Sequence, residues 1–193
     1  MNKIVVILFF LTIGFMSCAT SEKPNSKVKI TETFFEALNT SNSSEIKDLL
    51  ADSLITTIPK YEYEVRYSKN DYVENWLKWD CVFEPTYKVL QMHLEKGTVR
   101  AKVSKTDKRI LFFMKKPFLS NQILRFKNNK IISIEEESLN FDEATWGKNR
   151  TELLRWISKN HPELNGSIDD QTEAGAKKLL KALELYKNNV HQQ

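Results

Sequence analysis

The sequence predicts an α+β protein in which helices pack on a strongly curved antiparallel sheet. Three observations predict this class: apolar residues recur at helical spacing early in the chain, a series of extended runs follows, and amphipathic helical patterns return after Asn140. The dipeptides Lys96-Gly97 and Asn128-Asn129 separate extended runs and suit tight hairpins, because Gly and Asn tolerate positive φ. Such short links favour antiparallel pairing, since a parallel pair needs a longer crossover.

Two helices open the part of the chain that we expect to fold. In the first, apolar side chains recur every three or four residues from Val28 to Leu38, so one face has something to bury. Asn42, followed three residues later by Glu45, is a capping pattern that starts a short second helix running through Leu50. The β-branched run "SLITTIP" then predicts a strand.

A tyrosine-rich stretch, "YEYEVRYSKND", follows from Tyr61. Its aromatic and charged residues alternate, which predicts a strand with one aromatic face. Ser68 lies three residues before Asp71 and is a second capping signal, so a third helix begins there and ends near Asp80.

The sheet continues through five runs, which are "VLQMHL", "TVRAKV", "ILFFM", "NQILRF" and "IISIEEE". In the first run, Leu90, Met92 and Leu94 form an apolar face by their period of two. His93 is then expected on the opposite face together with Val89, which argues against a catalytic role for its imidazole.

After Asn140 the pattern is helical again. Leu153, Leu154 and Ile157 form one apolar stripe, which ends at His161-Pro162, and a last amphipathic helix covers residues 176–186. We expect residues 141–193 to form a helical extension packed on a domain made of residues 28–140.

The first 17 residues resemble the signal peptide of a bacterial lipoprotein. Lys3 precedes an apolar run from Ile4 to Phe15 that is too short to span a bilayer. The tetrapeptide "FMSC" resembles the lipobox, in the looser form found in Bacteroidetes. The resemblance implies that Cys18 carries diacylglycerol on its sulfur, that cleavage occurs before it, and that the new amino terminus is acylated. Several acyl chains anchor a protein firmly in a membrane.

Residues 18–27 are polar, contain a proline and predict a tether between the lipid and the domain. They lack an acidic cluster resembling a surface-export signal, so we expect a lipid anchor in the cell envelope, at the outer membrane and facing the periplasm. With Cys18 acylated, Cys81 is the only remaining thiol, which excludes an intramolecular disulfide. The net charge of +4 is spread along the chain, without the basic stripe of a nucleic-acid-binding protein.

The order of these elements resembles the NTF2-like superfamily, including its SnoaL-like branch. "YSKNDYVENWLKW" matches the third helix of that fold and "LRFKNNKIISIEEE" its final hairpin. The resemblance covers Val28 to Ser138 and implies a cone in which a curved sheet wraps around helices and leaves a pocket between them. Ketosteroid isomerase and scytalone dehydratase show that such a cone can host proton transfer by Asp, His and Tyr, but the fold alone supplies no chemistry.

The candidate pocket residues are aromatic side chains on the third helix and the sheet, namely Tyr63, Tyr72, Trp76, Trp79 and Phe112. Aromatic residues at such positions are also common in plain cores. Asp80, at the end of the third helix, and Glu136, which shares parity with Ile132 and Ile134, are the candidate catalytic acids. No metal-ligand spacing and no glycine-rich phosphate loop occurs, so we expect neither a metal nor a cofactor.

Three functions remain open at this point. The first is a membrane-anchored lipoprotein that binds a small apolar or amphipathic molecule in its cone. The second is an enzyme of the SnoaL or isomerase kind that uses an inward Asp or Glu. The third is a protein–protein interaction module. A second copy of the chain, bound through the sheet in a homodimer, is one partner to consider. An open cone with a buried carboxylate beside a tyrosine would favour the second.

Overall fold

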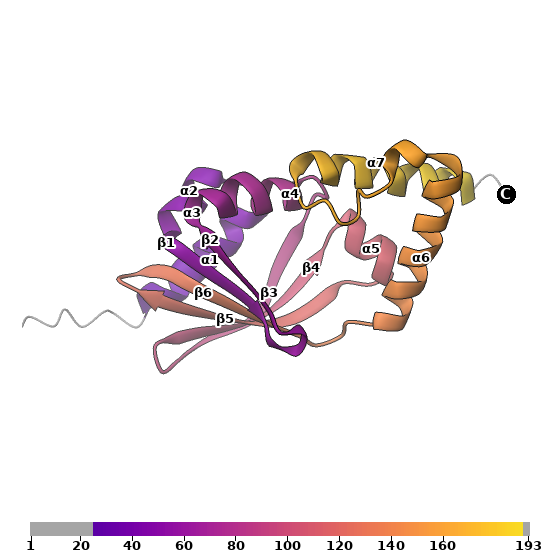
Figure 1. Ribbon diagram of the computed structural model, residues 1–193. Helices are drawn as coiled ribbons and strands as arrows, with labels where there is room; N and C mark the ends of the chain where they lie inside the picture. The colour runs from indigo at the N-terminus through magenta and orange to yellow at the C-terminus, as the bar shows by residue number, and fades with distance from the viewer. Residues whose placement is uncertain (1–24, 191–193) are drawn as a thin grey trace, which may run out of the picture.

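A computed structural model describes residues 25–190 of the chain (Figure 1). The predicted signal peptide and Cys18 lie outside these described residues. A six-stranded curved sheet runs through the molecule in the order β2-β1-β6-β5-β4-β3. Its strands are β1 (Leu50–Ile58), β2 (Tyr63–Ser68), β3 (Thr86–Glu95), β4 (Thr98–Thr106), β5 (Phe118–Lys127) and β6 (Lys130–Ser138).

Antiparallel pairing is confirmed for every neighbouring pair of strands except β1 and β6. The two predicted hairpins turn at Lys96-Gly97 and Asn128-Asn129, and all four residues have positive φ. β1 and β6 run parallel, because the chain between them forms the rest of the sheet and several helices and is long enough to cross over. The predicted α+β class with a curved sheet is therefore confirmed, with one parallel pair inside it.

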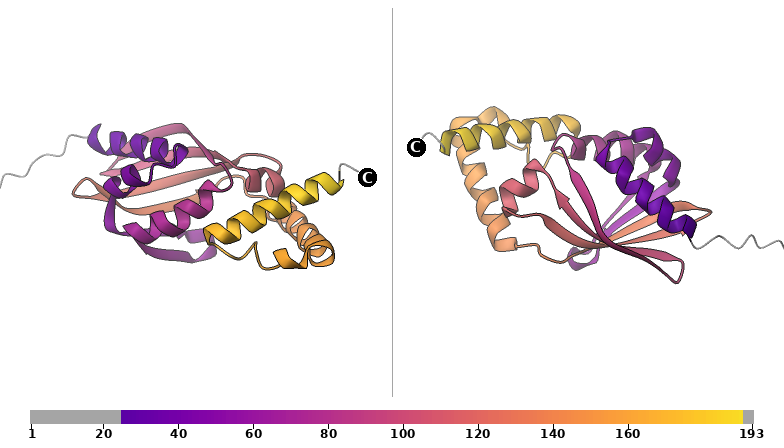
Figure 2. Two further views of the ribbon diagram at one scale, coloured as in Figure 1. Left: turned by 90° about the horizontal axis from the view of Figure 1, so that it is seen from above. Right: turned by 180° about the vertical axis from the view of Figure 1, so that it is seen from behind.

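Helices cover one face of the sheet (Figures 1 and 2). They are α1 (Asn25–Asn39), α2 (Ser43–Leu49), and a continuous helical run made of α3 (Lys69–Asp71), the π-helical turn η2 (Tyr72–Leu77) and α4 (Lys78–Cys81). Asn42 and Ser68 cap α2 and α3 as predicted. Their side chains accept hydrogen bonds from the backbone N–H groups of Glu45 and Asp71. α1 begins at Asn25, so residues 25–27 of the expected tether are helical.

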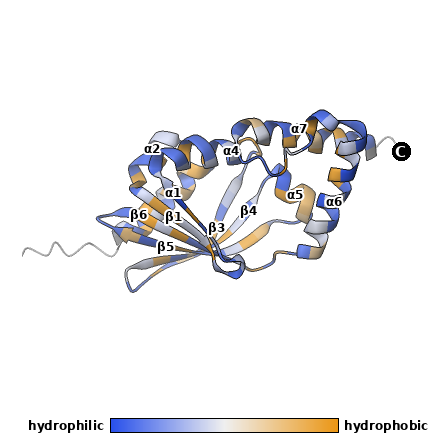
Figure 3. Cartoon of the chain, viewed as in Figure 1, coloured by the Kyte–Doolittle hydropathy of each residue, from blue (hydrophilic) through white to orange (hydrophobic). Residues whose placement is uncertain are grey.

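The prediction of a strand at "ILFFM" is wrong, because these residues belong to the helix α5 (Lys108–Met114). Asp107 caps this helix by accepting the backbone N–H of Ile110, and Lys115 ends it with positive φ. A short apolar run has no periodicity that separates a strand from a buried helix. Here all but one of its side chains are buried, and α5 is coloured hydrophobic over most of its length in Figure 3.

A β-bulge between Val89 and Gln91 shifts the register of β3. Leu90 is therefore 43% exposed on the outer face, whereas Val89 packs against the core, which reverses the expectation for both side chains. His93 is exposed on the outer face, as predicted.

The C-terminal helices α6 (Glu143–Asn160) and α7 (Glu173–Val190), with the 3₁₀ turn η3 (Pro162–Leu164) between them, extend the molecule beyond one end of the sheet (Figure 2). They form a second apolar cluster with α5, whereas the first lies between the sheet and α1 to α4. Phe113 is fully buried in the second cluster, where its ring lies 4.7 Å from that of Trp146. Among the helices of residues 25–190, none combines the length and apolar character needed to cross a bilayer.

Because α5 joins the sheet to the extension, truncating its buried face should destabilise the whole protein. We expect Phe113→Ala to lower the free energy of unfolding by about 3–5 kcal/mol, as for other buried aromatic side chains. The matched control, Leu111→Ala, changes an exposed residue of the same helix and should cost less than about 1 kcal/mol. Urea denaturation followed by fluorescence and circular dichroism measures both. Separate transitions for residues 28–140 and the extension would contradict this coupling.

Candidate functional site

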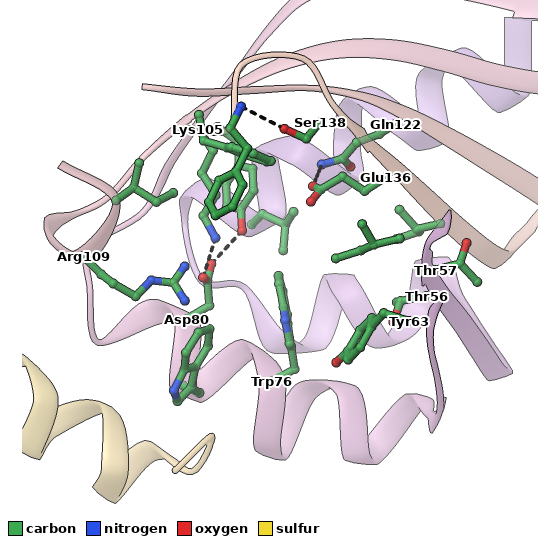
Figure 4. A pocket seen from close by; sticks show the side chains of 18 of the residues that line it. Thr56, Thr57, Tyr63, Trp76, Asp80, Lys105, Arg109, Gln122, Glu136 and Ser138 are labelled. Carbon is green, nitrogen blue, oxygen red and sulfur yellow. Dashed lines mark hydrogen bonds and ion pairs between the residues drawn. The ribbon is translucent and has the colours of Figure 1, made fainter. Parts of the chain in front are cut away.

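A cavity of about 490 Å³ lies between the sheet and the helices (Figure 4). Nearly half of its lining side chains are aromatic. Tyr72 and Trp76, both on the π-helical turn, are stacked with ring centroids 4.8 Å apart and form part of its wall. The C-terminal extension also contributes, through Trp146 and Gln171. The cone is therefore open rather than filled by its own side chains.

The mouth of the cavity is marked by lining residues that are exposed to solvent, namely Tyr61 (46%), Tyr63 (41%) and Gln171. Tyr61 belongs to the 3₁₀ turn η1 (Pro59–Tyr61) rather than to the predicted strand. Its hydroxyl donates to Glu143 Oε1 at 2.9 Å, and Lys60 Nζ bonds the same oxygen at 2.6 Å. These contacts hold the turn between β1 and β2 against the start of α6.

Inside the cavity, the carboxylate of Asp80 is completely buried and paired. It accepts a hydrogen bond from the hydroxyl of Tyr87 at 2.6 Å and one from the ammonium of Lys105 at 2.5 Å (Figure 4). Burial and the charge of Asp80 raise the pKa of the Tyr87 phenol well above its ordinary value, so this phenol stays protonated and donates. Burial and Asp80 also raise the pKa of Tyr72.

A second ion pair lies beside the first. The guanidinium of Arg109 is 3.2 Å from the buried carboxylate of Asp107 and stacks over the ring of Trp79, with its Cζ 4.4 Å from the ring centroid. Asp107 is also 3.8 Å from Lys105 Nζ. Each cation that lines the cavity is thus matched by a buried aspartate.

Glu136 is the other acid that lines the cavity. Its Oε2 accepts from Gln122 Nε2 at 3.1 Å and from Ser120 Oγ at 3.4 Å, but among the described residues no basic side chain lies within 4 Å of it. Burial raises the pKa of this carboxyl, and the more distant charge of Lys105 opposes the rise. Glu136 is therefore the acid of the cavity whose charge is least compensated.

Most of the predicted site residues meet in this cavity, and these are Tyr63, Tyr72, Trp76, Trp79, Asp80 and Glu136. Phe112 does not line it. Because "ILFFM" is a helix, Phe112 faces the extension, and its ring packs 5.6 Å from that of Tyr186. Within residues 25–190, no three His, Cys, Asp or Glu side chains gather as metal ligands would.

Sequence reasoning missed Lys105, Arg109 and Gln122. Two of them had a signal in strand parity. Lys105 lies on the same strand face as Val99, Ala101 and Val103, which are buried. Gln122 lies on the same strand face as the buried residues Ser120 and Leu124. Arg109 had no such signal, because it precedes the run "ILFFM" and the helix that contains both was not predicted.

No protein-family model matches the sequence, and a search among curated proteins found no match. Several solved structures are similar. A candidate ketosteroid isomerase from Kribbella flavida is 13% identical with a TM-score of 0.50, over 62% of this chain and 82% of that one. A protein of unknown function with a cystatin-like fold from Methylobium petroleophilum is 8% identical with a TM-score of 0.50, over 62% of this chain and 80% of that one. An NTF2-like protein of unknown function from Cytophaga hutchinsonii is 18% identical with a TM-score of 0.46, over 61% of this chain and 91% of that one.

This chain shares its fold with the ketosteroid isomerase candidate and with the cystatin-like protein. The resemblance seen in the third helix and the final hairpin is thereby confirmed at the level of the fold. At these identities the likeness says nothing about chemistry, because one fold hosts many activities. The site has to be interpreted from its own residues.

The pair of Asp80 and Lys105 should behave as one buried unit. Lys105→Met leaves a buried carboxylate uncompensated and should lower the free energy of unfolding by about 3–5 kcal/mol. Adding Asp80→Asn to that variant should recover most of this loss, because it removes the unpaired charge. A double-mutant cycle by urea denaturation measures the coupling. Losses that simply add would show that the two groups do not interact.

Glu136 should make stability depend on pH. Its folded-state pKa is raised, so the favourable effect of its protonation is complete below the unfolded value and is lost as pH rises through the folded one. Glu136→Gln should therefore raise the melting temperature at about pH 7.5 and leave it nearly unchanged at about pH 4. The matched control is Glu135→Gln, on the same strand, which removes an exposed pair with Arg125. An equal effect of Glu136→Gln at both pH values would be inconsistent with a raised pKa.

Proposed function

We propose that the protein binds a small amphipathic molecule in its cone. The observation that carries this proposal is an open cavity with aromatic walls whose lining cations are already paired with acids of the protein. A largely apolar, concave site with a few fixed polar groups is the usual form of a small-molecule site. The exposed tyrosines at the mouth give a ligand a route in from solvent.

The apolar part of such a ligand packs against the walls formed by Tyr63, Trp76 and Phe118, and its polar part reaches Glu136 and Gln122. Aromatic side chains supply large contact areas with few rotatable bonds, so little conformational entropy is lost on binding.

A second candidate function, proton transfer, is favoured by one observation. Glu136 faces the cavity with a carboxyl whose pKa is raised by burial, and a raised pKa makes a carboxylate a stronger general base. Asp80 is the weaker candidate, because both of its oxygens are engaged by Lys105 and Tyr87. An enzyme of this kind would exchange acidic C–H protons of a bound ketone with solvent, and Glu136→Gln would abolish the exchange seen by NMR in D₂O.

We also propose that the protein acts at a membrane. The support is the resemblance of residues 1–18 to a lipoprotein signal peptide with its lipidated cysteine. Acyl chains on Cys18 would anchor the domain in the cell envelope, at the outer membrane and facing the periplasm. Such an anchor places the cavity close to the lipids and amphiphiles of the envelope.

The binding function predicts that the neutral fluorescent probe N-phenyl-1-naphthylamine enters the cavity and gains fluorescence. Trp76→Ala should weaken its binding by about tenfold or more, because a wall of the site is lost. The same variant should lower the free energy of unfolding by less than a truncated core tryptophan does, which is about 3–5 kcal/mol. The control, Leu90→Ala, changes an exposed residue on the outer face and should leave the dissociation constant unchanged. Binding that is insensitive to Trp76 would place the probe elsewhere.

The membrane anchor predicts covalent lipid on Cys18. Cells fed a fatty-acid analogue should label the wild-type protein, and the protein should fractionate with membranes. Cys18→Ser should abolish both, whereas Cys81→Ser, at the other cysteine of the chain, should preserve them. Label retained by Cys18→Ser would refute the lipoprotein assignment.

A further inference from the structure

The charges around the cavity are not balanced. Asp80 and Asp107 are matched by Lys105 and Arg109 in two buried ion pairs. Glu136 is left over, and among the described residues its carboxylate accepts hydrogen bonds from the neutral donors of Gln122 and Ser120. When Glu136 is ionised, these five charged side chains carry one more negative charge than positive charges. An isolated buried charge is costly, so a ligand that supplies the opposite charge gains most here.

The walls of the cavity add to the negative potential. The face of an aromatic ring carries partial negative charge, and it attracts an ammonium group within about 6 Å. Figure 4 shows Glu136 facing the space that Trp76 and Tyr63 border from the helix and from β2. Tyr67, whose ring packs edge-on against Tyr72 at 5.6 Å, continues this aromatic border.

The protein already holds an ammonium group of its own, that of Lys105, between a carboxylate and aromatic rings. Lys105 Nζ lies 4.8 Å from the ring centroid of Tyr87 and 5.7 Å from that of Trp76, while it bonds the carboxylate of Asp80. An ammonium between a buried carboxylate and aromatic rings is therefore a stable arrangement in this cavity. A carboxylate and aromatic rings also border the cavity at Glu136, and among the described residues no basic side chain lies within 4 Å of that carboxylate.

We propose that the ligand of this cavity is an amphipathic organic cation, whose ammonium group lies between the Glu136 carboxylate and the rings of Tyr63 and Tyr67. The proposal rests on the binding function proposed above and names the chemical class of its ligand. An anionic ligand is disfavoured, because Lys105 and Arg109 are already paired and Glu136 would repel it. A neutral ligand fills the space but leaves the charge of Glu136 without a partner.

Three probes built on a chain of eight carbon atoms test the charge of the ligand by calorimetry at about pH 7.5. They are octyltrimethylammonium, which is cationic, octyldimethylamine N-oxide, which has nearly the same shape and no net charge, and octanoate, which is anionic. The purified protein should bind the cation about tenfold or more tightly than the N-oxide, and octanoate most weakly.

Glu136→Gln keeps the shape of the side chain and removes its charge, so it should abolish the preference for the cation. It should still bind N-phenyl-1-naphthylamine, which shows that the cavity is intact. Glu135→Gln changes the neighbouring acid, which pairs with Arg125, and should retain the preference. Equal binding of the three probes to the wild type, or a preference that survives in Glu136→Gln, would overturn the proposal while leaving the binding function in place. If no probe binds, both proposals fail together.

Discussion

A carboxylate that is completely buried has to be paired inside the protein, and that of Asp80 is paired by groups from two strands. Asp80 sits at the end of the helical run over the sheet, Tyr87 on β3 and Lys105 on β4. Leaving any of these groups without its partner would lower the free energy of unfolding by several kcal/mol, which is a large part of the stability of a domain. The helix end and the two strands are therefore held at fixed positions, and the width of the cone follows from them.

The same constraint determines the character of the cavity. Lys105 and Arg109 line it, but their charges are cancelled by Asp80 and Asp107 and are not available for a ligand. The remaining lining is apolar, with many aromatic rings, together with the carboxyl of Glu136 and neutral polar side chains such as Gln122. The C-terminal extension closes one end of this space through Trp146, and its own apolar cluster joins it to the domain through α5. The extension is thus part of the site and not only an appendage.

Much of this fold could be predicted from the sequence, because local signals agree with the final structure. Capping residues such as Asn42 and Ser68 and the turn dipeptides act over a few residues and need no tertiary context. The helix α5 could not be predicted, because five consecutive apolar residues suit a buried helix and a buried strand equally well. The faces of Val89 and Leu90 were reversed by a bulge, which no pattern of period two reveals.

The candidate site was predicted in part for a similar reason. Trp76 was expected at the pocket as an aromatic residue of the third helix, Asp80 as the acid at its end, and Glu136 from its strand parity, and all three line the cavity. The partner of Asp80 is Lys105, 25 residues further along the chain, and such a pair depends on the curvature of the sheet and the register of β3 with β4. The contribution of the extension depends on how two apolar clusters meet, which local patterns do not contain.

The four tryptophans of the chain provide a direct test of whether the cone is open and receives a small molecule. Trp76, Trp79 and Trp146 line the cavity, whereas Trp156 lies in the extension between His161 and Tyr186. With 5-fluorotryptophan incorporated and each signal assigned by single Trp→Phe variants, ¹⁹F NMR follows a titration with N-phenyl-1-naphthylamine. We expect saturable shifts for the three cavity tryptophans and an unchanged signal for Trp156. Shifts of all four signals alike, or of Trp156 alone, would contradict this expectation.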